Sequence, residues 1–195
     1  MVQLPLDKKY NAQDIIDCID WDKDVDGLTT YQKGLLVSNS DKAIVPCTAL
    51  GCKMIMEDVY GDLTGLNVCI VNRSDLIGKP LDALLRNNDC TVTVCHSKTE
   101  KNSLSSSLWF NDVVILGTGQ NRVWTRCDFN ESDQLVIDCS ICRDEDGKLC
   151  GEVITESLME VENDTFYLAK SPGGVGSIVT ALVCHNLMRC YELQK

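Results

Sequence analysis

Four short runs of apolar and β-branched residues in the middle of the chain constrain its fold more than any other feature. They are Asn67-Val-Cys-Ile-Val71, Thr91-Val-Thr-Val-Cys95, Asp112-Val-Val-Ile-Leu116 and Gln134-Leu-Val-Ile-Asp138. Strands of a parallel sheet are covered on both faces, so they are continuous apolar runs and do not alternate with polar residues. The runs therefore predict buried parallel strands.

Helical patterns lie between and around these runs. Lys79–Arg86 has leucines at helical spacing and Pro80 in its first turn, and a second helix is expected over 102–111. Strand, helix and strand together have the length of a right-handed crossover. We therefore expect residues 59–160 to form an α/β, Rossmann-like domain.

The flanking segments also contain helix candidates. Ala12–Ile19 and Gly51–Tyr60 are candidates within residues 1–58, and Ser177–Leu193 is a candidate at the other end. The expected faces of this last helix are His185, Arg189 and Glu192 on one side, and Val183, Leu187 and Cys190 on the other.

The charge balance limits the partners of the chain. With 18 basic and 29 acidic side chains among 195 residues, the net charge is −11, which disfavours nucleic acid and anionic membranes. No stretch approaches the ~20 apolar residues of a membrane helix. The segment Met1–Lys9 has no apolar signal-peptide region, so we expect a cytoplasmic location.

The twelve cysteines do not have the spacing of a metal site. Cys139-Ser-Ile-Cys142 is the only CxxC, and the histidines, His96 and His185, are far apart in sequence. A structural zinc is therefore not expected. Buried thiols that act as small apolar side chains are the simpler interpretation, above all for Cys69 and Cys95.

The loop after the first predicted strand is the expected place for a nucleotide, because backbone amides at a helix N-terminus meet phosphate there. This loop contains only Gly78 and lacks the GxGxxG fingerprint. The second strand ends at Ser97 without the carboxylate that binds the ribose of NAD. Arg73 with Ser97 favours NADP, although NAD remains possible. Alternatively, Arg73, Lys98 and Lys101 are only solvated surface charge.

Eight motifs together resemble one family, the bifunctional methylenetetrahydrofolate dehydrogenase/cyclohydrolases. In order, they are Val2-Gln-Leu-Pro-Leu6, Lys23-Asp-Val-Asp-Gly27, Pro46-Cys-Thr-x-x-Gly51, Arg73-Ser-x-x-x-Gly-Lys-Pro80, Thr91-Val-Thr-x-Cys-His-Ser97, Gly117-Thr-Gly119, Lys148-Leu-x-Gly151 and Pro172-Gly-Gly-Val-Gly176. The resemblance covers the whole chain.

The resemblance implies two α/β domains with a cleft between them. Hydride would pass from 5,10-methylenetetrahydrofolate to a nicotinamide cofactor on the Rossmann-like domain, and the methenyl product would be hydrolysed to 10-formyltetrahydrofolate. Residues 1–58 would be the C-terminal half of a folate-binding domain, residues 59–160 the NAD(P)-binding domain, and residues 161–195 a glycine loop and a helix that returns to the folate domain.

The resemblance also implies roles for single residues. Gln3 matches a glutamine that supports the catalytic lysine, and Asp26 matches a carboxylate that holds the pterin through paired hydrogen bonds. Pro172, Gly173 and Gly176 match a loop that lines folate and nicotinamide. The matching cofactor-binding positions are Thr48, Arg73, Ser74, Ile77, Ser97, Thr118, Gly119 and Ile141. His96 is expected to be structural or a cofactor neighbour, and His185 a surface residue.

Several family features are absent from these 195 residues. The catalytic lysine belongs to a Tyr-x-x-x-Lys motif that precedes the segment at Val2, and the match at Tyr191–Lys195 is in the wrong context. We therefore expect the cyclohydrolase step to be lost. Asn72 and Ser140 stand where the family has glycine. Asn72 tolerates a positive φ, whereas the Ser140 side chain is expected to reduce cofactor affinity.

Three interpretations remain open from the sequence. The first is a truncated dehydrogenase that binds NADP and a tetrahydrofolate derivative. The second is a non-catalytic binding or assembly subunit, and the third is one half of a split enzyme. We expect a homodimer, or a partner chain that covers the incomplete folate domain.

Overall fold

The computed structural model describes residues 1–130, 133–158 and 166–195, and its centre is a parallel β-sheet. The sheet has five strands in the order β2-β1-β3-β4-β7. The strands are β1 (Asn67–Val71), β2 (Thr91–Cys95), β3 (Val113–Leu116), β4 (Leu135–Asp138) and β7 (Tyr167–Ala169). The predicted α/β, Rossmann-like sheet is confirmed, and the four apolar runs form four of its strands.

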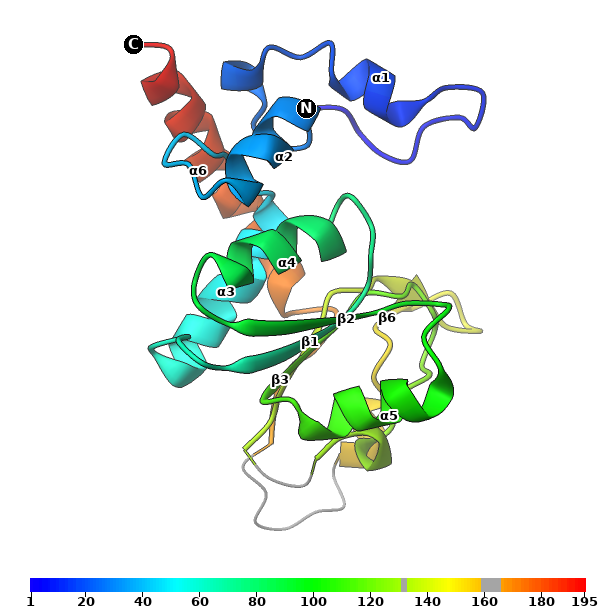
Figure 1. The fold of residues 1–195 in the computed structure, drawn as a ribbon. Coiled ribbons are helices and arrows are strands. Elements are labelled where there is room, and N and C mark those ends of the chain that lie inside the picture. The colour runs from blue at the N-terminus through cyan, green and yellow to red at the C-terminus, as the bar shows by residue number, and fades with distance from the viewer. Residues whose placement is uncertain (131–132, 159–165) are drawn as a thin grey trace.

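Helices cover both faces of this sheet, with α3 and α4 on one side and α5 on the other (Figure 1). The helices are α1 (Ala12–Ile16), α2 (Thr30–Val37), α3 (Cys47–Tyr60), α4 (Gly78–Arg86), α5 (Lys101–Phe110) and α6 (Val175–Leu193). Short 3-10 helices lie at Trp21–Lys23, Arg126–Asp128 and Thr155–Leu158, and β5 (Cys142–Arg143) pairs with β6 (Leu149–Cys150) in a hairpin.

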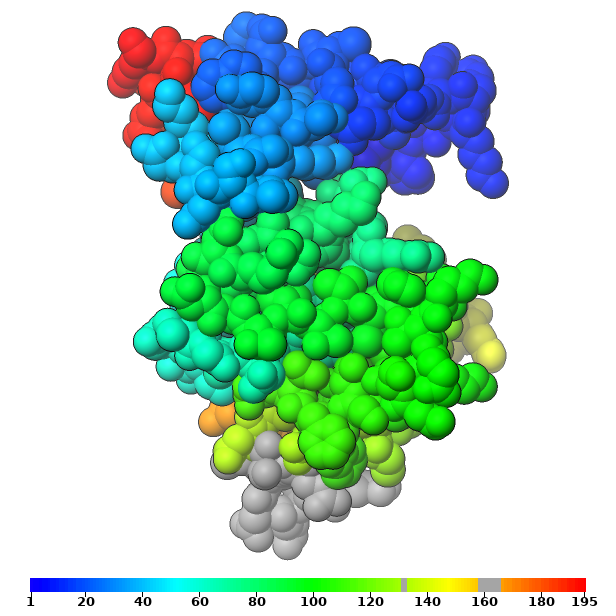
Figure 2. Space-filling model, viewed as in Figure 1, coloured from blue at the N-terminus to red at the C-terminus, as the bar shows by residue number. Residues whose placement is uncertain are grey.

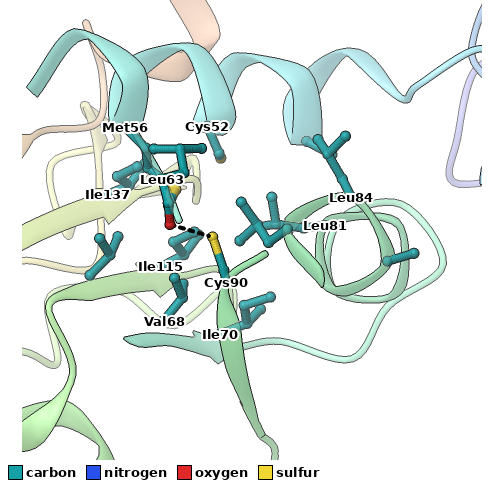
Figure 3. Packing of buried hydrophobic residues seen from close by; sticks show 14 of the residues in the cluster. Cys52, Met56, Leu63, Val68, Ile70, Leu81, Leu84, Cys90, Ile115 and Ile137 are labelled. Carbon is teal, nitrogen blue, oxygen red and sulfur yellow. Dashed lines mark hydrogen bonds between the residues drawn. The ribbon is translucent and has the colours of Figure 1, made fainter. Parts of the chain in front are cut away.

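The strand residues alternate between two apolar cores. Val68 and Ile70 of β1 point toward α3 and α4, where they meet Met56 of α3 and Leu81 of α4 (Figure 3). Cys69 of β1 points the other way, into the core under α5. Burial on both faces explains why Val68–Val71 of β1 contains no polar residue.

The first and last segments of the chain lie together at one end of the molecule (Figure 2), above the sheet drawn in Figure 1. Helix α6 packs along α3, and the amide group of Asn186 donates to the backbone oxygens of Val25 at 3.0 Å and Val45 at 2.8 Å. A methyl group on Gly51 would lie 3.1 Å from Val175, so glycine lets the two helices approach closely. The N-terminal segment is therefore held by the last helix.

Some sequence predictions differ from the structure in detail. Strand β2 is an edge strand in which only Cys95 is buried, because none of the described strands pairs with its outer side. The first helix ends at Ile16 and not at Ile19. Helix α3 begins at Cys47 and not at Gly51, directly after Pro46.

Helix α6 and strand β7 also differ from the sequence predictions. Helix α6 buries Leu182, Asn186 and Cys190, whereas Leu187, predicted for the apolar face, is 58% exposed. Strand β7 lies beyond residue 160, where we placed the end of the Rossmann-like domain. The domain boundaries stay a prediction. Within the described ranges, no helix has both the length and the apolar character needed to cross a membrane.

Candidate functional site

A cavity of about 300 Å³ lies at the carboxyl ends of β1, β2 and β3. Its lining residues are Val71, Asn72, Arg73, His96, Ser97, Leu104, Gly117, Thr118, Gln120 and Trp124. The chain runs outward from β1 to β2 and then crosses to β3 on the opposite side of β1. Ligands of open α/β sheets bind at such a topological switch point. The cavity is therefore in the position that a nucleotide takes in this architecture.

Arg73 and Ser97 come together at the mouth of this cavity. The guanidinium Nη2 of Arg73 donates to the Ser97 hydroxyl oxygen at 3.4 Å, across the ends of neighbouring strands β1 and β2. His96 is held beside them, because its Nδ1 accepts from the Lys98 N–H at 3.2 Å. Among the described residues, none that lines the cavity is acidic. The pair has the chemistry to bind a phosphate group.

Asn72 ties the loop after β1 to the loop after β3. Its side-chain oxygen accepts from the backbone N–H of Ser74 at 2.6 Å and of Gly78 at 3.0 Å, and its amide donates to the oxygen of Gly117. Its φ is not positive, so the conformational tolerance that we expected of asparagine is not used. A side chain at Gly78 would clash with the Asn72 backbone, which explains the glycine in this motif.

Two buried acidic residues, Asp138 and Glu152, lie behind the wall of the cavity, and the sequence analysis missed both. Asp138 ends β4 and accepts from the N–H groups of Glu152 at 2.6 Å, Ser140 at 3.0 Å and Val153 at 3.1 Å. Burial raises the pKa of Asp138, and these hydrogen bonds oppose the shift. A side chain at Gly151 would clash with Asp138. The glycine of the Lys148-Leu-x-Gly151 motif is therefore the sequence feature that indicates the close approach of this segment to Asp138.

Ser140 belongs to the same buried group. Its hydroxyl donates to Glu152 and lies 3.2 Å from the backbone nitrogen of Gly119, and the residue is 6% exposed. The side chain thus points away from the cavity, not into the space that a ligand would need.

A second cavity, of about 580 Å³, brings Gln3 and Asp26 together with Thr48 and Ile77. Burial raises the pKa of Asp26; the N-terminal amine opposes this shift and the carboxylate of Asp24 adds to it. Gly27 follows with a φ of +67°, and a side chain there would clash with the Ile44 backbone. Glycine therefore permits the turn that carries Asp26 into this cavity.

The loop from Asn72 to Ile77 borders both cavities. Asn72 and Arg73 line the first, whereas Leu76 and Ile77 line the second. Ligands bound in the two cavities would therefore lie on either side of one short loop.

The remaining predicted residues lie near the cavities or away from them. Thr118 lines the first cavity, and Ser74 and Gly119 adjoin its walls. Ile141 is 66% exposed and lines neither cavity. Pro172 and Gly173 are exposed between β7 and α6, and Gly176 is exposed in the first turn of α6; all three lie outside both cavities. His185 is exposed on α6, and the described residues contain no cluster of three metal-binding side chains.

A parallel sheet with a cavity at its switch point is the architecture of the Rossmann-like class of nucleotide-binding proteins. Residues 46–195 match the family model described as the NAD(P)-binding domain of tetrahydrofolate dehydrogenase/cyclohydrolase. The chain belongs to this family, which confirms the resemblance found in its motifs. The match begins with α3 and includes α6, a wider range than residues 59–160.

Known relatives are longer than this chain. The bifunctional protein FolD of Rickettsia massiliae is 36% identical over 192 residues, which cover 98% of this chain and 65% of the relative. The solved bifunctional 5,10-methylenetetrahydrofolate dehydrogenase/cyclohydrolase of Thermoplasma acidophilum is 32% identical with a TM-score of 0.87, covering 100% and 67%. The Trypanosoma brucei enzyme, solved with NADP and an inhibitor, is 26% identical with a TM-score of 0.84, covering 98% and 66%.

Proposed function

We propose that this chain binds NADP and a tetrahydrofolate derivative and takes part in the oxidation of 5,10-methylenetetrahydrofolate to methenyltetrahydrofolate. The observation that carries the proposal is the pair of cavities on either side of the Asn72–Ile77 loop. One has Arg73 and Ser97 at its mouth, and the other contains Asp26 and Gln3. The nicotinamide, when bound, accepts the hydride, and the protein brings donor and acceptor together.

Each cavity has side chains suited to its proposed ligand. The Arg73 guanidinium with Ser97 suits the additional phosphate of NADP, and the lack of acidic lining residues avoids repulsion. The Asp26 carboxylate can accept two N–H bonds from a pterin edge, beside Gln3. Because the net charge of −11 repels anionic ligands at long range, these local groups must supply the attraction.

We also propose that these 195 residues alone lack cyclohydrolase activity. Hydrolysis of the methenyl group needs a proton-transfer group, which commonly contributes a factor of about 10²–10⁴. The Tyr-x-x-x-Lys motif that the family resemblance assigns to this step occurs here only at Tyr191–Lys195, at the end of α6. That segment lines neither cavity.

A second function, as a binding or assembly subunit, is favoured by one observation. The Asn72 side chain already accepts from the backbone N–H of Gly78 at the start of α4 and from that of Ser74 in the loop before it, and such amides are the groups that a phosphate would use. Leu187, Met188 and Tyr191 are exposed on α6, where a second copy or a partner chain could cover them. A split enzyme would use the same surface. The homodimer and the cytoplasmic location stay predictions.

A binding and activity measurement distinguishes these functions. We expect the purified protein to bind NADPH more tightly than NADH in a saturable fluorescence titration. We also expect it to convert methenyltetrahydrofolate no faster than the uncatalysed reaction. Failure to bind either nucleotide, together with a stable complex with another chain in native mass spectrometry, would instead establish the assembly subunit. Cyclohydrolase activity above the uncatalysed rate would contradict the second part of the proposal.

Binding of tetrahydrofolate should weaken as the pH falls, and the midpoint of this loss should lie at a higher pH than the ordinary pKa of an aspartate. Burial raises the pKa of Asp26, so its carboxylate becomes protonated above the ordinary range near pH ~3.9 and loses the acceptor that the pterin needs. The affinity is therefore present at neutral pH and is lost as the pH falls. Fluorescence titration from about pH 4 to pH 8 would measure this.

Two variants serve as references for that titration. Asp26→Asn should bind weakly at every pH and show no midpoint, whereas Asp20→Asn, on the exposed surface, should titrate like the parent protein. A midpoint that persists in Asp26→Asn would assign the titration to another group.

A further inference from the structure

A carboxylate that lies entirely inside the protein contacts the wall of the first cavity, the one lined by Arg73 and Ser97. Glu152 is 0% exposed and follows the β5–β6 hairpin. One of its oxygens, Oε1, accepts from the Gly119 N–H at 2.7 Å and from the Ser140 hydroxyl. The other, Oε2, accepts from the Thr118 hydroxyl at 2.9 Å and from the Trp124 indole N–H at 3.1 Å.

Three of these contacts fix the segment that lines the cavity. Thr118 and Trp124 are lining residues, and Gly119 lies between them in the chain. The Thr118 hydroxyl gives its proton to Glu152 and accepts from the Gln120 N–H at 3.3 Å, so its side chain is turned inward. The backbone oxygen of Glu152 also accepts from the Trp124 N–H at 3.1 Å.

We propose that Glu152 is a positioning residue for the nucleotide, which fixes the segment from Thr118 to Trp124 against the sheet. This inference rests on the proposed function, because it assumes that the cavity binds NADP. Glu152 has no contact with the cavity itself and acts through the residues that it holds. Ser140, which replaces the family glycine, adds a donor to the same carboxylate and supports this arrangement.

The donors explain why a carboxylate is needed. Each oxygen faces one hydroxyl, which can rotate to accept, and one N–H, which can only donate. A glutamine at this position would place its NH₂ group against either the Gly119 N–H or the Trp124 indole N–H. Both orientations leave two donors facing each other in a buried site, which is costly.

The substitution Glu152→Gln should therefore weaken NADPH binding by about 10- to 100-fold, a range typical of losing a buried polar contact. The probe is NADPH, and the fluorescence of its own nicotinamide reports binding, so the signal does not depend on Trp124. The matched control is Glu57→Gln, because Glu57 is exposed on α3, pairs with Lys53 at 2.5 Å and lines neither cavity. The control should bind like the parent protein.

A double variant tests the donor argument directly. Trp124→Phe removes the indole N–H, so glutamine can place its NH₂ group beside the Thr118 hydroxyl and keep its oxygen on Gly119. Glu152→Gln/Trp124→Phe should therefore bind NADPH several-fold more tightly than Glu152→Gln, which is a coupling that independent losses would not produce.

Circular dichroism and thermal unfolding of each variant separate folding from positioning. If Glu152→Gln does not fold, Ser140→Ala provides the milder test, with an expected loss of about three- to ten-fold from one missing hydrogen bond. Unchanged NADPH affinity in a folded Glu152→Gln, or strictly additive effects in the double variant, would overturn the inference and leave the proposed function intact. No NADPH binding by the parent protein would overturn the proposed function itself.

Discussion

Replacing Arg73 with alanine should weaken NADPH binding by about 10- to 100-fold and leave NADH binding nearly unchanged. Hydrogen bonds from a charged group to a phosphate contribute about 1.5–3 kcal/mol, and only NADP has a phosphate at the 2′ position of its ribose. Arg73 reaches Ser97 across the ends of β1 and β2, where that ribose is expected. Parallel titrations with NADPH and NADH, followed by nucleotide fluorescence, measure the change in discrimination.

Arg86→Ala is the reference variant for this measurement, because Arg86 is exposed on α4, pairs with Asp82 at 2.9 Å and does not line the cavity. It should change neither affinity. If Arg73→Ala also left both affinities unchanged, Arg73 would be surface charge, which is the alternative that the sequence left open together with Lys98 and Lys101. An equal loss for both nucleotides would place Arg73 on a phosphate that NAD and NADP share.

Met56→Ala should destabilise the fold by about 2–5 kcal/mol, the usual cost of truncating a large buried side chain and leaving a cavity. Met56 is 0% exposed in the core between α3 and the sheet (Figure 3). Met54 lies on the same helix and is 45% exposed, so Met54→Ala should change stability by less than about 0.5 kcal/mol. Denaturant unfolding of both variants measures the difference.

Similar losses in the two methionine variants would contradict the packing described here. They would show that the outer face of α3 is also covered in solution, for example by another chain. A small loss in Met56→Ala alone would show that the core of the protein rearranges to fill the space.

The sheet could be predicted from sequence because its central strands are buried on both faces. Val68–Val71 and Val113–Leu116 have no polar position, which distinguishes them from surface strands. Strand β7 could not be predicted, because Tyr167–Ala169 is three residues long and lies at the edge of the sheet. Edge strands have little buried surface and therefore a weak pattern.

Site residues could be predicted from the sequence where they belong to a recognisable motif. Arg73 and Ser97 were found from the loop after β1 and the end of β2, and the structure brings them into contact. Glu152 and Asp138 were missed because acidic residues in sequence resemble solvated surface charge, and their burial depends on contacts between distant loops. Glu152, for example, accepts a hydrogen bond from Thr118, which is 34 residues earlier in the sequence.

Helix α6 gives the chain a particular order of assembly during synthesis. It packs on α3, more than a hundred positions earlier in the sequence, and Asn186 bonds to the backbone of Val25 and Val45. These contacts close the largest loops in the molecule, so they form late. On the ribosome, the sheet can assemble from residues already made, whereas residues 1–46 must remain without their partner helix until α6 emerges. The interval before α6 is released is therefore when this protein is most exposed to misassembly.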